Sequence, residues 1–202
     1  MLDEIFDSYG FLYRKILDNI YPAKNSTGFP ERNLSVNFSK AYESVALHNN
    51  QEAFTWFEFQ FGKSNNLHVD AVIINNSTKE LFVIESKRYS HPASKMKEIG
   101  EDIDRIYLFV DELKRENDSD IFRIKVDLFE HIYGVILADI WSENPQKTDI
   151  LQAYKDGMLL EKYSDDMKHL HDIKNVDYDI QSFSDNEDVK KYHLVSFVWK
   201  LR

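Results

Sequence analysis

Apolar residues recur along this chain with two different periods, and the change from one to the other marks its elements. A spacing of three to four positions, typical of amphipathic helices, holds over three stretches: residues 1–21, 35–50 and 93–117. A period of two, in segments rich in β-branched and aromatic residues, predicts three consecutive antiparallel strands: residues 53–62, 67–75 and 80–87. Two later stretches also have strand character: residues 132–141 and 193–202.

The order of these elements predicts the fold class. Two helices precede three strands, and a long helix then crosses to a further strand, which favours an α/β fold with a mixed central sheet flanked by helices. The polar, acidic stretch from 163 to 193 predicts an irregular excursion before the last strand. An apolar fraction of 43% is enough for the core of a single domain, residues 1–202.

Composition argues against several classes of function. The chain has no cysteine, which excludes disulfides, thiolate zinc sites and cysteine nucleophiles. It has neither a glycine-rich phosphate loop nor a G-x-S-x-G elbow, so it lacks the motifs of nucleotide-driven motors and of α/β-hydrolases. The acidic first ten residues do not fit a signal peptide, and no apolar run is long enough to span a bilayer. We therefore expect a cytoplasmic protein with no membrane partner.

The hairpin between the second and third predicted strands carries candidate chemistry. A turn centred between Ser77 and Thr78 sets a register in which Val72 faces Val83 and Asp70 faces Glu85. Opposed side chains have Cβ atoms about 4.5 to 5.5 Å apart, so both carboxylates would reach one metal ion, whereas bare like charges there are destabilising. Lys87 follows Glu85 by two positions and points to the same face. Such oxygen ligands suit Mg²⁺, which activates water and phosphoryl groups, and a nearby lysine steadies the developing negative charge.

These residues resemble a known signature. The segments H-V-D-A-V-I-I and L-F-V-I-E-S-K-R are similar to the Asp, then Glu-x-Lys motif of the PD-(D/E)XK, or restriction-endonuclease-like, nuclease superfamily. Asp70, Glu85 and Lys87 stand at its motif positions, although no proline precedes Asp70. The superfamily's helix, three strands, helix and strand correspond to a core over 35–141, with a helix over 1–21 before it and an extension over 142–202 after it.

The resemblance implies a restriction-endonuclease-like core and a Mg²⁺-dependent endonuclease, with Mn²⁺ as a substitute, that cuts DNA in restriction, defence or repair. Asp70 and Glu85 would hold the metal, and Lys87 would position the attacking water. Many members add a carboxylate from the first core helix, where Glu43 stands, although its position lies away from the apolar stripe of that helix. Glu58 is the substitute candidate. A homodimer or a protein that supplies sequence specificity is the further partner expected.

Charge gives two opposed indications. The net charge of −10 counts against nucleic-acid binding, because that affinity comes mostly from lysine and arginine. However, residues 86–97 (SKRYSHPASKMK) contain lysine and arginine but no acid, directly beside the motif. Arg88 and Lys95 are the residues of this run that we expect to contact phosphate.

Two other interpretations stay open. Glu-x-Lys triplets are common by chance on solvated strand faces. An acidic protein that retains the nuclease fold could also bind a basic protein partner without cutting anything. An intact set of Asp70, Glu85 and Lys87 argues against such a retired site, because opposed carboxylates without an ion between them are unfavourable.

Overall fold

A computed structural model of the chain describes residues 1–19, 30–61, 67–88, 92–115, 124, 126–142, 144–162, 173–176, 178 and 191–202. Within these residues six strands form one sheet: β1 (Ala53–Phe61), β2 (Leu67–Asn75), β3 (Glu80–Arg88), β4 (His131–Trp141), β5 (Lys174–Asn175) and β6 (Tyr192–Lys200). Their order is β1-β2-β3-β4-β6-β5, with β3 and β4 parallel and the other neighbours antiparallel. A parallel pair requires a crossover, and helix α3 (Pro92–Arg115) provides it.

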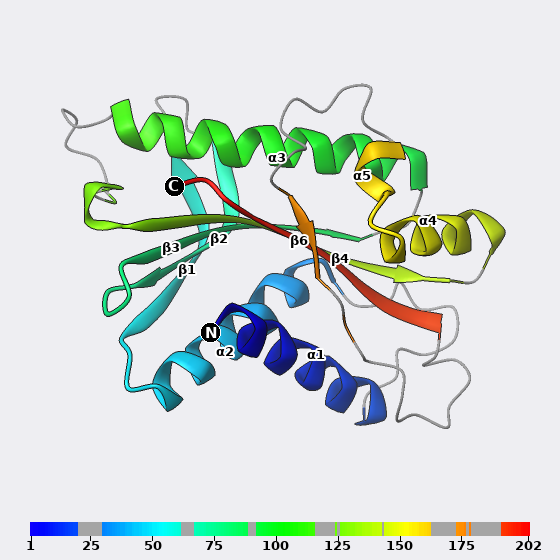
Figure 1. Ribbon diagram of the computed structural model, residues 1–202, viewed down its shortest axis with the longest axis horizontal. Coiled ribbons are helices and arrows are strands. Elements are labelled where there is room, and N and C mark those ends of the chain that lie inside the picture. The colour runs from blue at the N-terminus through cyan, green and yellow to red at the C-terminus, as the bar shows by residue number, and fades with distance from the viewer. Residues whose placement is uncertain are drawn as a thin grey trace.

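Helices cover both faces of this sheet (Figure 1). Helix α3 runs along one face, and α1 (Leu2–Asn19) and α2 (Arg32–His48) pack on the other. Helices α4 (Pro145–Lys155) and α5 (Leu159–Lys162) add apolar residues to the α3 side, and a short 3-10 turn spans Val126–Leu128. The predicted α/β class, a mixed sheet flanked by helices, is confirmed.

Strand β3 shows how the sheet separates two apolar cores. Its odd-numbered residues Leu81 and Val83 pack under α3, and its even-numbered residues Phe82 and Ile84 pack under α1 and α2. A strand covered on both faces needs this continuous apolar run, because successive side chains point to opposite sides. The next odd position is Glu85, so a carboxylate enters the α3 side of the sheet.

The second half of the chain departs most from the sequence prediction. Helices α4 and α5 were not expected, although a start signal for α4 is present: the Asn144 side chain accepts a hydrogen bond from Lys147 N at 3.0 Å, and Pro145 opens the first turn. The excursion expected over 163–193 lies mostly outside the described residues. Within it, the pair Lys174–Asn175 forms the short strand β5.

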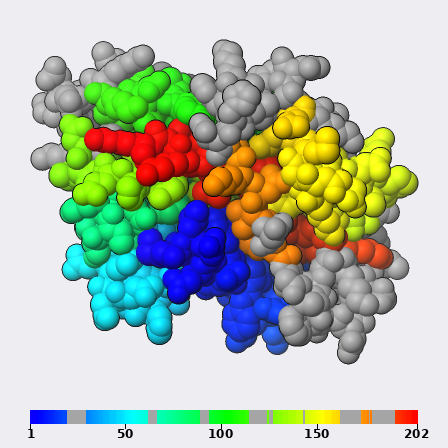
Figure 2. Space-filling model, in the orientation of Figure 1, coloured from blue at the N-terminus to red at the C-terminus, as the bar shows by residue number. Residues whose placement is uncertain are grey.

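The last strand takes an inner position in the sheet. Strand β6 lies between β4 and β5, and Trp199 stands opposite Gly134 of β4. A Cβ at Gly134 would come within 2.3 Å of the Trp199 ring, so only glycine allows this approach. Figure 2 shows the chain's red C-terminal segment and blue α1 on the same face of the molecule. A search of the described residues finds no helix with both the length and the hydropathy to cross a membrane.

Candidate active site

The motif residues lie where β2 and β3 part. Pairing along this hairpin follows the predicted register through Val72 and Val83. It ends at the next pair, one position before Asp70 and Glu85. The register is therefore confirmed, and the two carboxylates stand at the open end of the ladder instead of forming a further pair within it.

A change of face in β1 and β2 creates this opening. In β1, Phe57 packs on the α1 and α2 side, but Phe59 packs on the α3 side although it is only two residues away. Glu58 between them has a φ of 53°, a value uncommon for a residue with a side chain. The partner residues in β2 make the same change on either side of Asp70, and Glu58 and Asp70 are left out of the β1–β2 register. The local turn frees Asp70 from the regular ladder.

Asp70 uses this freedom to bond to β3 through its side chain. Its Oδ2 accepts a hydrogen bond of 2.7 Å from the backbone N–H of Ser86. Burial raises the pKa of Asp70, although this hydrogen bond and the charge of Lys87 act to lower it. The carboxylate therefore accepts the hydrogen bond that a backbone carbonyl of β2 would otherwise accept, and this bond fixes Asp70 against the Glu-x-Lys segment.

Glu85 is a buried acid held by an arginine of α3. Its side chain is 3% exposed, and its Oε1 accepts a hydrogen bond of 2.9 Å from Arg105 Nη1. The pKa of Glu85 is raised to about 8. Burial is the largest cause, and the charges of Asp102 and Asp70 outweigh the opposite effect of Arg105. Glu85 thus lies among like charges that one guanidinium does not balance.

Lys87 belongs to the same cluster through a second acid of α3. Its Nζ lies 3.2 Å from Asp102 Oδ2, and Asp102 Oδ1 lies 2.8 Å from Arg105 Nη1. Burial alone would lower the pKa of Lys87, but Asp102 and Glu85 outweigh it and the pKa is raised. The structure therefore brings Lys87 and Glu85 together with Asp102 and Arg105 in one chain of ion pairs.

Asp102 and Arg105 are site residues that the sequence interpretation missed. The apolar stripe of α3 includes Ile99, Ile103 and Ile106, and Asp102 falls within that stripe. Asp102 is accordingly 1% exposed, and burial raises its pKa against the effect of Lys87 and Arg105. An acid on the apolar face of a helix was the signal that would have identified it.

The acid of the α2 region that lies beside the cluster is Glu31, not the predicted Glu43. Glu43 Oε1 accepts a hydrogen bond of 2.6 Å from Thr55 of β1, on the α1 and α2 side of the sheet. Glu31, directly before α2, accepts a hydrogen bond of 2.8 Å from the backbone N–H of Arg88 at the end of β3. Its charge also acts on the pKa values of Asp70 and Lys87. The structure does not bring Glu43 to the cluster.

The basic run beside the motif is partly neutralised by the helix that follows it. Lys95 Nζ lies 2.6 Å from Glu98 Oε2, and its side chain is 19% exposed. Lys97 Nζ lies 3.8 Å from Glu101 Oε1. Arg88 is half-buried and follows the alternation of β3 to the side opposite α3. Lys95 is therefore engaged within α3, and Arg88 points away from Glu85.

The carboxylate oxygens of the cluster are donor atoms of the type that Mg²⁺ binds. The carboxylates of half-buried Asp70 and of buried Glu85 and Asp102 lie beside the two cations Lys87 and Arg105. In the described part of the chain no donor bonds to Asp70 Oδ1 or Glu85 Oε2, and no group of three or more His, Asp or Glu is arranged as a metal site. Two carboxylates are the usual protein share of a Mg²⁺ site, whose other ligands are water and phosphate.

Comparisons with known proteins add no assignment. Protein-family models, curated proteins and solved structures contain no match to this chain. The arrangement of the residues themselves is thus the basis for any functional conclusion.

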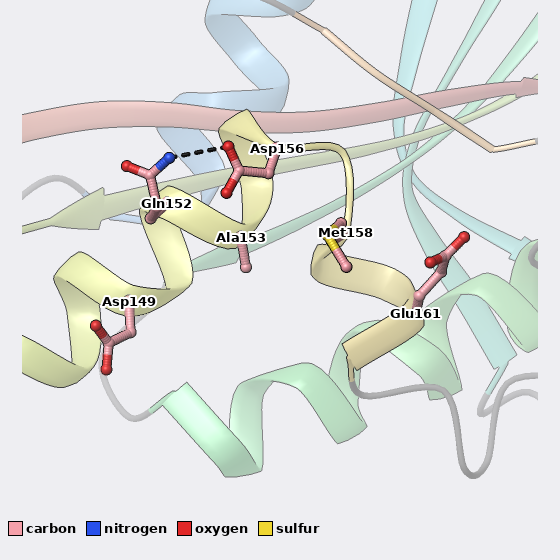
Figure 3. A pocket seen from close by; sticks show the side chains of 6 residues that line it. All are labelled: Asp149, Gln152, Ala153, Asp156, Met158 and Glu161. Atoms are coloured by element: carbon pink, nitrogen blue, oxygen red, sulfur yellow. Dashed lines mark hydrogen bonds between the residues drawn. The ribbon is translucent and has the colours of Figure 1, made fainter.

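A separate cavity of about 620 Å³ lies between α4 and α5, and none of the predicted site residues lines it. Figure 3 shows Asp149, Asp156, Met158 and Glu161 around it, with Gln152 bonded to Asp156. Its charged side chains are all acidic, so it offers no positive charge to a nucleic acid.

Proposed function

We propose that the protein is a metal-dependent endonuclease on a restriction-endonuclease-like core. The observation that carries the proposal is the meeting of Asp70, Glu85 and Lys87 at the open end of the β2–β3 ladder. Glu85 is a buried acid and Asp70 a half-buried one, both with raised pKa values, and acids with perturbed pKa values gathered in one place are typical of functional sites. The order of helix, three antiparallel strands, crossover helix and parallel strand supports the same interpretation.

The chain's own residues then have distinct tasks. Asp70 and Glu85 would hold the cation, with Asp70 fixed in place by its hydrogen bond from Ser86 N–H. A bound Mg²⁺ or Mn²⁺ would polarise the scissile phosphate and lower the pKa of a water molecule. Lys87, kept protonated by Asp102, would orient that water and stabilise the negative charge that develops on phosphate. DNA is the substrate that we propose, because the motif residues resemble those of the PD-(D/E)XK nuclease superfamily.

A second candidate is a protein that keeps this fold but binds a basic partner without cutting. The ion pairs favour it, because Glu85 is bonded to Arg105, Lys87 is paired with Asp102, and Lys95 is paired with Glu98. A net charge of −10 also suits a basic protein partner better than DNA. The two candidates differ in whether the carboxylates bind metal.

Calorimetric titration with Mg²⁺ and Mn²⁺, with plasmid cleavage in the same buffers, tests the proposal. We expect wild-type protein to bind metal and nick plasmid, and Asp70→Asn to lose both, with a rate at least about 100-fold lower. Asn keeps the size of the side chain but loses the charge that attracts a cation. Asp104→Asn, an exposed acid on α3, is the matched control and should retain both properties.

The opposite result has a clear meaning. Wild-type protein that binds neither metal and leaves single-stranded DNA, duplex DNA and RNA intact would refute the nuclease proposal. The non-catalytic binding protein would then be the better interpretation.

A further inference from the structure

One carboxylate of α3, that of Asp102, contacts both Lys87 of β3 and Arg105, the partner of Glu85. Asp102 Oδ2 lies 3.2 Å from Lys87 Nζ, and Asp102 Oδ1 lies 2.8 Å from Arg105 Nη1. The same Nη1 atom lies 2.9 Å from Glu85 Oε1. Asp102 is thus linked directly to Lys87 and through one nitrogen to Glu85.

The surroundings of Asp102 make a purely packing role a poor explanation. Its neighbours on the buried stripe of α3 include Ile99, Ile103 and Ile106, all 2% exposed or less. A protein in which apolar residues of similar size replace a buried ion pair is often as stable or more stable, because burying charges carries a large desolvation penalty. A carboxylate at this position is therefore better explained by what it holds than by stability.

We propose that Asp102 is a positioning residue of the site, which fixes the Lys87 ammonium and is itself held by Arg105. This inference rests on the nuclease proposal, since it assigns Asp102 a task in that reaction. Lysine has a flexible four-carbon stem, and a fixed acceptor removes its freedom to turn away from the phosphate. Asp102 acts through Lys87 and does not itself contact the substrate.

Arg105 gives the arrangement a second anchor. It lies three residues after Asp102 on α3, so one turn of helix carries both groups that contact β3. If a cation bound Glu85, Arg105 would still have Asp102 as a partner. Asp102 would then remain in place for Lys87.

Steady-state kinetics of plasmid cleavage test this role with Asp102→Asn, using Asp104→Asn as the exposed control on the same helix. We expect kcat to fall by about 10- to 100-fold, with KM and the calorimetric affinity for Mn²⁺ changed by less than about fivefold. Asp104→Asn should match the wild type in all three. A KM that rises while kcat stays unchanged would overturn the positioning role.

A double-mutant cycle separates action through Lys87 from a general loss of structure. In the Lys87→Ala background, Asp102→Asn should change kcat by less than about twofold, because the side chain that it positions is gone. Equal losses of kcat in both backgrounds would overturn the inference. If Asp102→Asn does not fold, as judged by circular dichroism, Asp102→Glu enters the same cycle and keeps the charge at a shifted position.

The two proposals fail in different ways. Wild-type protein that cuts and an Asp102→Asn variant with full kcat would overturn the positioning role and leave the nuclease intact. Wild-type protein that neither binds metal nor cuts would overturn both.

Discussion

At the scale of single residues, the carboxylate of Glu85 dominates the electrostatics of the site. Burial, together with the charges of Asp102 and Asp70, raises its pKa from the usual 4.5 to about 8. Because the folded protein holds this proton more tightly than the unfolded chain does, Glu85 favours folding below pH 4.5. That contribution is lost as pH rises from 4.5 towards about 8, where the ionised form becomes buried.

We predict that Glu85→Gln reduces this pH dependence in the absence of metal. At pH 4, below the ordinary glutamate pKa of 4.5, the variant and the wild type should have similar free energies of unfolding, since Glu85 is then mostly neutral in the folded and unfolded chain alike. At pH 9 the variant should be more stable, on the order of 2 kcal/mol, because it avoids a buried charge. Urea denaturation in EDTA at a series of pH values measures both, and the exposed control Glu101→Gln should show no such divergence.

At the scale of elements, the turn in β1 at Glu58 decides where Asp70 lies. Positive φ at a residue with a side chain stores about 1 kcal/mol or more of strain, and such strain is common beside functional sites. Here its structural effect is that β2 leaves the regular ladder at Asp70, next to Glu85. A strand of uniform twist would keep Asp70 within the ladder.

Substitutions at Glu58 test this interpretation. Glu58→Gly should match or exceed the stability of the wild type, because glycine adopts a φ of 53° without strain. Glu58→Val should lower the free energy of unfolding by about 1 to 2 kcal/mol, because a β-branched residue resists this conformation. Gln60→Val, exposed on the same strand, is the control for β propensity, and urea denaturation compares the three. Equal effects of valine at 58 and 60 would contradict the strain.

The sequence predicts the elements of this fold better than the contacts between them. The β2–β3 register followed from the position of the turn between the strands, and a slip of one residue would move every apolar side chain to the wrong face. The inner place of β6 depends on pairing between strands far apart in the chain, which no local pattern records. Glu31 accepts a hydrogen bond from the N–H of Arg88, 57 residues away, so its place beside the cluster could not be inferred from spacing. The family expectation pointed to Glu43 instead.

At the scale of the whole molecule, acidic residues limit how DNA could approach. The net charge is −10, and the three lysines of the basic run beside the motif, Lys87, Lys95 and Lys97, are paired with acids of α3. Affinity for DNA should therefore be weak at physiological salt and should depend on a small number of phosphate contacts.

We predict that Glu98→Gln increases the affinity of the protein for duplex DNA by about two- to fivefold at low salt, because it frees Lys95 and removes a negative charge beside it. Fluorescence anisotropy with Ca²⁺ in place of Mg²⁺ measures binding at several salt concentrations. Asp104→Asn, an exposed acid on α3 beyond this run, is the control for net charge alone. The same gain in both variants would show that Lys95 has no particular role.

The inner position of β6 also has a consequence during synthesis. Strand β4 is complete at Trp141, but its partner on the side away from β3 is residues 192–200. A nascent chain that ends before Tyr192 therefore presents the apolar β4 with one unpaired edge, which is a template for pairing with other chains. Ribosomes paused in this interval would hold an aggregation-prone intermediate with an exposed strand edge.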